Sequence, residues 1–287
     1  MGECAEYPVT VLPTWLDEYI YQEKSSEFGQ LYDRFMARDL SQEELSGRYL
    51  GTYFPRSYAE SRSIFTNCFN ACQDCLKDKT EVSILDFGCG TGGDLFGLID
   101  AIMDCRPAVR VLTIFWCDVS DAARSVFCQL ITKWRQQNTG LKLSGKAFIH
   151  DVHAIDDFRS HTQAASRVCP AGYDIVTSFK AINELYQDGY NGQPYKDFYD
   201  VFWPLVKNNG AFCIEDLTFR YPDEPTGVWI PDLLGRISPP LSARPFNNST
   251  EHHQFPVQTS RNPNDFQKVT YKLFIKDEKL ISLDWSF

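Results

Sequence analysis

The stretch "SILDFGCGTGGDLFGL", residues 83–98, joins an apolar run to an apolar helical pattern through a short segment rich in glycine. Gly88, Gly90 and Gly92 lack a Cβ, so the backbone can approach a ligand closely at these positions. A helix that begins here directs unpaired N–H groups toward the same place, which favours a negatively charged group. We therefore expect a small-molecule site where the strand ends and the helix begins.

The surrounding chain alternates short apolar strands with helices between residues 82 and 219. Ser120 is the expected N-cap of one helix, and another opens on Pro194 and closes on Gly210. Apolar strands that alternate with helices predict a parallel sheet covered on both faces, and right-handed crossovers make that sheet doubly wound. The expected strands are 82–88, 109–120, 145–152, 173–182 and 210–219, and the expected helices are 92–104, 121–137, 156–168 and 194–210.

Three flanking segments complete the expected architecture. Residues 1–80 have helical and irregular patterns, and residues 219–265 are rich in proline and polar residues. The closing run "QKVTYKLFIKDEKLISLDWSF" alternates on both sides of "KDE", which predicts an antiparallel β-hairpin. We predict an α/β fold with a seven-stranded, mostly parallel, Rossmann-like sheet. Its parts are a helical N-terminal cover at 1–80 and a core at 81–287 that carries the insertion 219–265.

The composition narrows the partners. The 287 residues carry a formal net charge of −10, which disfavours a broad phosphate-binding surface. No apolar run reaches the roughly 20 residues of a membrane span, and the N-terminus lacks the pattern of a signal peptide. The ten cysteines are scattered as reduced thiols are. We expect a cytoplasmic protein that has no membrane partner, and the sequence assigns no oligomeric state.

Cys68, Cys72 and Cys75 form the one cysteine cluster, "NCFNACQDC". Their CxxxCxxC spacing also occurs in radical enzymes that hold an iron–sulfur cluster. Here the residues continue an amphipathic helix, on which the three thiols share one face. That face suits burial as well as ligation. We favour burial and predict no metal site.

A carboxylate stands at the end of each of the first three expected strands. Asp86 precedes the glycines and could hold an ammonium group, Asp118 could accept hydrogen bonds from a ribose diol, and Asp151 could accept one from an adenine amine. Gly88, Gly90 and Gly93 also satisfy the dinucleotide pattern GxGxxG, which leaves a nicotinamide- or flavin-dependent oxidoreductase open. Neighbouring carboxylates would repel a pyrophosphate, so they favour a nucleoside joined to a cationic amino acid.

With these motifs the chain resembles the class I S-adenosylmethionine-dependent methyltransferases. "ILDFGCGTG" is similar to their first motif, "CDVS" to their second, "HDV" to their third and "YDIVTSFKAINEL" to their fourth-strand motif. The resemblance implies S-adenosylmethionine as cofactor and a methyltransferase activity. It implies that the three glycines surround the methionine part, that Asp118 contacts the ribose and Asp151 the adenine, and that Phe179 of the fourth-strand motif lies against the cofactor.

A fainter similarity links "GRYLGTYFPRSYAESRSIF", "INEL" and "FWPLVKNNGAFCIED" to the methyltransferase-like proteins of small ribosomal subunits. The chain departs from them because it lacks their C-terminal cysteine cluster and is strongly acidic. We interpret this similarity as common ancestry. The alternative function that it raises is an RNA-binding ribosome-assembly factor with a basic groove, in which Arg48, Arg56 and Arg62 would take part.

Glu184 and His252 are the candidate catalytic residues. Glu184 follows the fourth strand, where it could orient or deprotonate an acceptor, and His252 lies in the insertion beside His253. Glu215 and Asp216 follow the fifth strand, where alternation sends one toward the site and the other away. Non-basic covers favour a nitrogen or oxygen acceptor on a small molecule or peptide side chain over a nucleic acid. Aromatic or cationic residues expected to close or line the pocket are Tyr53, Phe54, Arg56, Tyr58, Tyr221 and Trp229.

Overall fold

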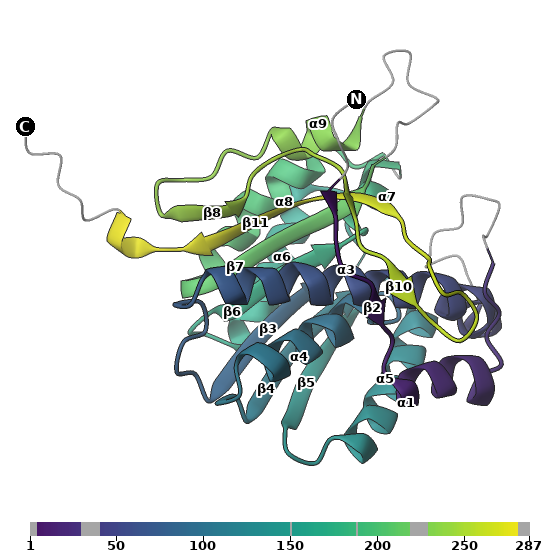
Figure 1. The fold of residues 1–287 in the computed structure, drawn as a ribbon. Helices are drawn as coiled ribbons and strands as arrows, with labels where there is room; N and C mark the ends of the chain where they lie inside the picture. Colours follow the sequence, from purple (N-terminus) through teal and green to yellow (C-terminus); the bar gives the residue numbers. More distant parts are fainter. Residues whose placement is uncertain (1–4, 30–40, 150, 188, 219–228, 281–287) are drawn as a thin grey trace, which may run out of the picture.

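A computed structural model describes residues 5–29, 41–149, 151–187, 189–218 and 229–280. A central mixed sheet organises these parts (Figure 1), with nine strands in the order β1-β9-β11-β7-β6-β3-β4-β5 and β8 paired to β11. Five strands are mutually parallel, and β11 runs antiparallel to β7. Their bounds are β3 Glu81–Phe87, β4 Val111–Asp118, β5 Lys142–Ile149, β6 Tyr173–Phe179, β7 Val206–Leu217 and β11 Lys268–Lys276.

Strand order reverses beside the first parallel strand. From β3 the chain moves outward through β4 to β5, then returns to β6 on the other side of β3 and continues to β7. This arrangement is the doubly wound sheet predicted from the sequence. Ligands of such sheets bind at the carboxyl ends of the strands, at the point of reversal. The glycine loop, residues 88–92, directly follows β3 and so lies at that point.

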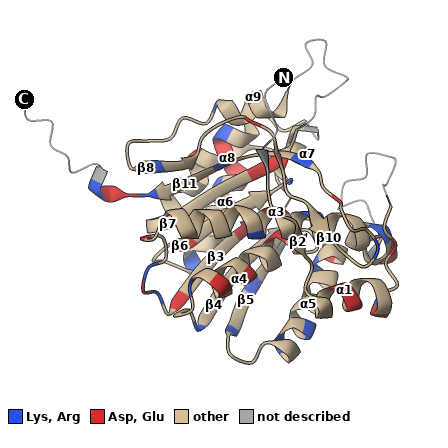
Figure 2. Cartoon of the chain, in the orientation of Figure 1, with Lys and Arg blue, Asp and Glu red and all other residues tan. Residues whose placement is uncertain are grey.

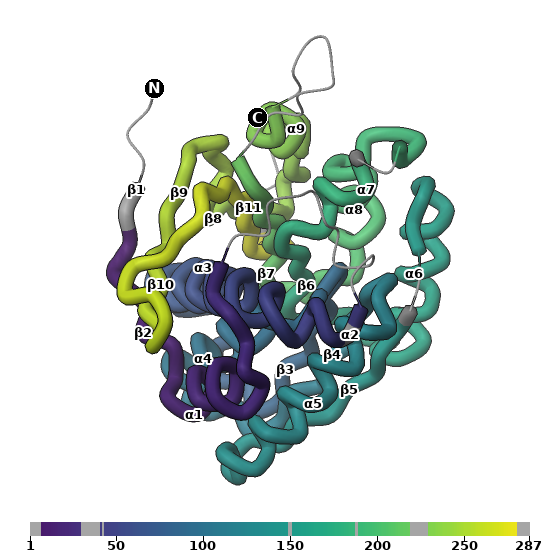
Figure 3. Tube along the Cα trace, turned by 90° about the vertical axis from the view of Figure 1, so that its right-hand side faces the viewer, coloured from purple at the N-terminus to yellow at the C-terminus, as the bar shows by residue number. Residues whose placement is uncertain are grey.

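Helices cover both faces of the sheet, and each face has its own apolar core (Figures 1 and 3). Phe65, Phe96 and Phe127 belong to one core, whereas Phe158, Phe198 and Phe212 belong to the other. On the first face lie α1 Thr14–Glu18, α3 Leu50–Ala71, α4 Gly93–Cys105 and α5 Asp121–Gln137; on the second lie α6 Ile155–Val168, α8 Pro194–Phe202 and α9 Ile230–Gly235.

The N-terminal cover differs from the helical segment that the sequence predicts. It contains two strands, which pair in parallel with strands of the insertion, β1 with β9 and β2 with β10. Each has only two residues, too few to show an alternating pattern. The elements are β1 Ala5–Glu6, β2 Thr10–Val11, the π-helical turns η1 Tyr19–Glu23 and η3 Leu45–Tyr49, α2 Gln42–Glu44, β9 His253–Gln254 and β10 Val257–Gln258.

The first strand of the predicted closing hairpin is β11, and most of the second falls outside the described residues. Strand β11 pairs with β7 on one edge and with β8 (Ala243–Asn247) and β9 on the other. The insertion therefore supplies two strands beyond β7 and β11, and β1 of the N-terminal cover is the ninth strand of the sheet. Glu278–Leu280 form a 3-10 turn, and residues 281–287 lie outside the described residues.

Helix α3 ends earlier than the cysteine spacing suggests. It stops at Ala71, so Cys72 is its C-cap and Cys75 lies in the turn that follows. The guanidinium of Arg106 donates hydrogen bonds to the carbonyl oxygens of Cys72 (3.1 Å) and Cys75 (2.8 Å), which satisfies acceptors that the helix end leaves open. Cys68 and Cys75 are buried. Within the described ranges no group of three or more acidic, cysteine or histidine side chains could hold a metal ion.

A buried ion pair fixes the insertion to the cover. The Arg56 guanidinium donates to both carboxylate oxygens of Asp265, at 2.7 Å and 2.9 Å, and both side chains are almost fully buried. The sequence placed Arg56 over the ligand site. The structure instead uses it to join α3 to the end of the insertion.

Replacing Asp265 by alanine should lower the free energy of unfolding by about 3–5 kcal/mol, because it leaves a buried guanidinium without its counter-charge. Urea denaturation measures this loss. The control is Arg62→Ala, which removes a pair to Asp104 at 2.9 Å whose side chains are 32% and 57% exposed. That change should cost at most about 1 kcal/mol. Equal losses in the two variants would contradict a structural role for the buried pair.

Candidate functional site

Backbone hydrogen bonds to the neighbouring strand give the glycine loop its shape. The N–H groups of Gly88 and Cys89 both donate to the carbonyl oxygen of Cys117, at 2.8 Å and 3.2 Å. Within the loop, the N–H of Gly92 donates to the carbonyl oxygen of Cys89 at 2.7 Å. The end of β4 therefore holds the loop at the carboxyl edge of the sheet, where α4 begins.

The three predicted glycines adopt left-handed backbone angles, with φ of +72° at Gly88, +50° at Gly90 and +86° at Gly92. Two of them also face close neighbours. A Cβ on Gly88 would lie 2.1 Å from the Ala181 Cβ, and one on Gly92 would lie 2.3 Å from the Phe127 ring. The absence of a side chain at Gly88 thus lets the segment after β6 approach the loop, and its absence at Gly92 lets α5 do so.

Gly90 differs from the other two because it faces a more open space. A Cβ built there would find one heavy atom within 4 Å, the hydroxyl oxygen of Tyr49 at 3.6 Å. Gly90 is itself buried, so this space lies inside the site, under Tyr49. Tyr49 lies over it from the end of η3, where the sequence gave no signal.

Asp118 ties the loop to the following helix. One of its carboxylate oxygens accepts a hydrogen bond from the N–H of Gly90 and the other from the N–H of Ser120, both at 2.7 Å. Ser120 in turn caps α5 by accepting from the N–H of Ala123 at 3.1 Å, as predicted. A carboxylate has about four acceptor positions, so two remain for the hydroxyl groups of a ligand.

Asp86 lies beneath the loop. Its side chain is completely buried, and the neighbouring carboxyl is that of Asp94, in the first turn of α4. Burial, reinforced by Asp94, raises the pKa of Asp86 far above its usual range. Asp86 therefore presents no exposed surface in this structure, and its role toward an ammonium group stays a prediction. Sequence position shows that a carboxyl follows a strand but not which side of the loop it occupies.

The buried carboxyls predict a pH-dependent stability. Burial raises the pKa of Asp94 to about 7, against an ordinary value of about 4 in an unfolded chain. A group with a raised pKa binds its proton more tightly in the folded state, so its stabilising effect is complete below about pH 4. That effect disappears as the pH rises through about 7.

Between pH 5 and pH 8 the unfolding free energy of the wild type should therefore fall more steeply than that of Asp94→Asn. Urea denaturation at a series of pH values measures this difference. Asp104→Asn, at a largely exposed carboxylate, is the matched control and should follow the wild type. A wild-type curve that rises relative to Asp94→Asn over this interval would give the wrong sign and refute the assignment.

Glu184 lies in the first turn of α7 (Ile182–Gln187), which a buried carboxyl holds in place. Asp216 accepts hydrogen bonds from the N–H of Asn183 (3.0 Å) and from the hydroxyl of Tyr195 (2.8 Å). Burial raises the pKa of Asp216 to about 6, although these donors oppose the shift. The network fixes the start of α7 at the carboxyl edge of β6 and β7.

Glu215 points to the opposite face of the sheet, as the alternation of strand side chains predicts. The neighbours that influence its carboxyl include Glu60 of α3 and Lys180, and burial raises its pKa far above the usual range. The Lys180 ammonium pairs with Glu60 and also donates to Gln267 at 3.0 Å. The Lys180 ammonium group is therefore already paired with protein groups beneath the glycine loop.

The remaining predicted cofactor contacts occupy less constrained positions. Asp151 follows β5 with a half-exposed carboxylate that pairs with the His153 ring at 3.1 Å. It also accepts from the N–H of Val152 at 3.0 Å. Phe179 ends β6 and is 5% exposed, packed in the apolar core. The roles of Asp151 toward adenine and of Phe179 toward a ligand stay predictions.

The two histidines of the insertion have different surroundings. His252 packs edge-on against Trp229 with ring centroids 5.4 Å apart. His253 is buried, and its Nδ1 forms a hydrogen bond with the Tyr7 hydroxyl at 3.0 Å. Burial lowers the pKa of His253. These contacts place His253 in the packing of β9 and His252 beside Trp229, at the start of α9. Glu184 lies near the Tyr49 hydroxyl at the loop, whereas the catalytic role of His252 stays a prediction.

The residues predicted to close over the ligand mostly pack elsewhere. Phe54 and Tyr58 are buried in the core between α3 and α4, and Arg56 pairs with Asp265. Tyr53 stays near the loop, because its ring lies 5.0 Å from that of Tyr49. Tyr221 lies outside the described residues.

The arginines proposed for an RNA groove each pair with an acid. Arg48 lies 3.4 Å from Glu27, Arg62 lies 2.9 Å from Asp104, and Arg56 pairs with Asp265 as described above. Figure 2 shows Lys and Arg spread over many elements rather than gathered along one. These three arginines therefore form no shared basic groove.

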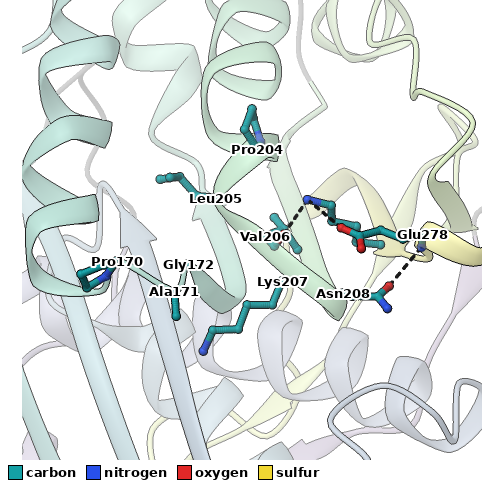
Figure 4. A pocket seen from close by; sticks show the side chains of 10 residues that line it. Pro170, Ala171, Gly172, Pro204, Leu205, Val206, Lys207, Asn208 and Glu278 are labelled. Carbon is teal, nitrogen blue, oxygen red and sulfur yellow. Dashed lines mark hydrogen bonds and ion pairs between the residues drawn. The ribbon is translucent and has the colours of Figure 1, made fainter.

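A separate cavity of about 350 Å³ lies at the opposite edge of the sheet, where β6 and β7 begin (Figure 4). The ammonium group of Lys207 contacts Asp174 at 3.0 Å, and that of Lys276 donates to the Val206 carbonyl oxygen at 2.9 Å. Both cations are already paired. The amino edge of a parallel sheet is also not where such folds bind ligands.

The known proteins that resemble this chain were found among solved structures. No family model and no curated protein matches the sequence. A suspected RNA methyltransferase from Pyrococcus horikoshii is 10% identical at a TM-score of 0.45, over 91% of this chain and 98% of that one. A suspected class I S-adenosylmethionine-dependent methyltransferase from Listeria monocytogenes is 14% identical at a TM-score of 0.44, over 91% and 79%. The magnesium protoporphyrin IX methyltransferase of Synechocystis, solved with bound S-adenosylmethionine, is 9% identical at a TM-score of 0.39, over 76% and 79%.

Proposed function

We propose that this chain is an S-adenosylmethionine-dependent methyltransferase that acts on a nitrogen or oxygen nucleophile of a small molecule or peptide side chain. The observation that carries the proposal is the junction of Gly90 and Asp118. An open, left-handed glycine backbone lies at the strand reversal, and a half-buried carboxylate is hydrogen-bonded to it at the end of the next strand. A nucleoside with a ribose diol needs this pair of features.

The charges around the loop favour this ligand over a dinucleotide. Asp86 and Asp94 lie beneath the loop and Asp118 beside it. The Lys180 ammonium, which influences Asp94, is already engaged by Glu60. A pyrophosphate would meet the Asp118 carboxylate beside the loop, whereas a sulfonium ligand with one carboxylate and one ammonium carries a net positive charge.

Each residue of the site has a distinct task. Bound S-adenosylmethionine would supply an electrophilic methyl group on sulfur. Asp118 would accept the ribose hydroxyls with its two remaining acceptor positions, and the backbone at Gly90 would face the amino-acid part. Glu184, in the first turn of α7, would take a proton from the nucleophile that receives the methyl group. Transfer then depends on holding nucleophile, methyl carbon and sulfur in line with water excluded.

Nine cysteines lie in the described part of the chain, and all are free thiols. Free thiols are the state of cysteine in a reducing compartment, which supports a cytoplasmic location. Within the described ranges, no helix has the length and apolar character that crossing a membrane requires.

Isothermal titration calorimetry tests the proposal with S-adenosylmethionine, S-adenosylhomocysteine and NAD⁺ as three separate ligands. The expected result is saturable, one-to-one binding of the two adenosyl amino acids and none of NAD⁺. Binding of NAD⁺ alone would favour the oxidoreductase. An absence of binding by all three ligands at millimolar concentration would refute a cofactor site at the glycine loop.

A further inference from the structure

We propose that Tyr49 and Glu184 form the acceptor side of this site and that its methyl acceptor is an amine nitrogen. The inference rests on the proposed function, which it narrows from any nitrogen or oxygen nucleophile to one class. It assigns a binding role to Tyr49, which lies outside every sequence motif of the site.

Two close approaches to the glycine loop bring these residues together. Tyr49 reaches the loop from the cover, with its hydroxyl oxygen 3.6 Å from the Cβ position of Gly90. The segment that leads to Glu184 reaches the loop at Gly88, where the Ala181 methyl group fills the space beside that glycine. The Glu184 carboxylate is close enough to Tyr49 to raise the pKa of its hydroxyl, so both residues stand at the same five-residue loop.

The local backbone holds Tyr49 rather than leaving it on a loose loop. It ends the π-helical turn η3 and continues directly into α3, and such turns inside helices recur at functional sites. Its ring packs 5.0 Å from that of Tyr53 and against the apolar core of that face. The hydroxyl is thus directed by packing toward Gly90.

The charges that surround the Tyr49 hydroxyl are negative. After burial, the groups that most raise its pKa are Glu184, Asp118, Tyr53 and Asp94, and together they hold that pKa well above the usual range. Tyr49 therefore stays protonated and neutral at physiological pH. A neutral hydroxyl between carboxylates offers a lone pair to an N–H group, and the carboxylates attract a cation.

An amine fits this environment better than an acid or a phenolate. An ammonium group is attracted to Glu184, and its proton can pass to the Glu184 carboxylate, which frees the nitrogen lone pair. The nitrogen then forms a bond to the methyl carbon while the carbon–sulfur bond breaks, and its electron pair stays on the now neutral sulfur. The positive charge moves from sulfur to nitrogen, and the proton taken up by Glu184 passes to solvent, which restores its carboxylate.

The test uses a pair of probes that differ at the methyl position. S-adenosylhomocysteine has a neutral sulfur there, whereas sinefungin carries a primary amine on carbon. We expect wild-type protein to bind sinefungin about tenfold more tightly than S-adenosylhomocysteine, since one charge-assisted hydrogen bond contributes about 1.5 kcal/mol or more. Glu184→Gln and Tyr49→Phe should each bring this ratio toward one and leave the affinity for S-adenosylhomocysteine within about twofold.

Glu81→Gln serves as the control, because Glu81 is exposed at the opposite end of β3. It should keep the wild-type ratio. If both probes bind and the ratio is the same in all four proteins, the acceptor assignment is wrong and the proposed function stands. If neither probe binds the wild type, the proposed function itself fails, and this inference fails with it.

Discussion

Asp118→Ala should reduce the affinity for S-adenosylhomocysteine by at least about 100-fold, because two charge-assisted hydrogen bonds to a ribose diol contribute about 1.5 kcal/mol or more each. The structure adds a second reason for a large effect. Asp118 also accepts from the N–H groups of Gly90 and Ser120, so its removal frees the open part of the glycine loop. Binding and loop shape are then lost together, and calorimetry measures the result.

Asp121→Ala is the matched control. Asp121 stands three residues further on, at the start of α5, and its exposed carboxylate pairs with Arg124. That variant should bind as the wild type does. Asp118→Asn keeps the size of the side chain and can still accept from one N–H group, so it should fall between the two. Wild-type affinity in Asp118→Ala would remove Asp118 from the site.

Gly92→Ala should lower the free energy of unfolding by about 3 kcal/mol, from about 1 kcal/mol for a left-handed residue with a Cβ and about 2 kcal/mol for overpacking. The added methyl group would lie 2.3 Å and 2.5 Å from two carbons of the Phe127 ring. That ring cannot move aside easily, because it is completely buried and packs 5.0 Å from Trp116 and 5.9 Å from Phe96.

Gly140→Ala is the control, because it shows how much a glycine-to-alanine change alters stability when the new methyl group meets no neighbour. Nothing lies within 4 Å of a Cβ at Gly140, and its backbone is not left-handed. Urea denaturation should find it within about 0.5 kcal/mol of the wild type, as expected for a surface change away from packing. A second test is Phe127→Leu, which should recover part of the loss when combined with Gly92→Ala. A Gly92→Ala protein as stable as the wild type would contradict the tight packing of the loop on α5.

The core of the fold follows from patterns that are strong in the sequence. The runs that form β3 and β6 are mostly apolar and are buried, whereas β5 at the edge of the sheet has a more polar sequence and several exposed residues. The Ser120 cap and the opposite directions of Glu215 and Asp216 were also predicted, since both depend on local geometry alone. The position of the loop at the strand reversal follows from those strands and the right-handed crossovers.

Features that depend on distant contacts were not predictable in the same way. Tyr49 reaches Gly90 from forty-one positions earlier, through the placement of η3 and α3, and no motif marks it. Asp86 has the spacing of a ligand contact, yet α4 brings Asp94 beside it and closes it off from solvent. The strands β8, β9 and β10 lie in a segment of mixed polarity, and with five, two and two residues they are too short for an alternating or apolar run to mark them.

A structure determined with S-adenosylhomocysteine bound is the most direct test of the central claim, that the glycine loop and Asp118 hold an adenosyl amino acid. The account predicts the ribose hydroxyls on the Asp118 carboxylate, the amino-acid part over Gly90, and the sulfur facing Tyr49 and Glu184. A ligand bound elsewhere, or bound at the loop with Asp118 turned away from its ribose, would contradict the claim.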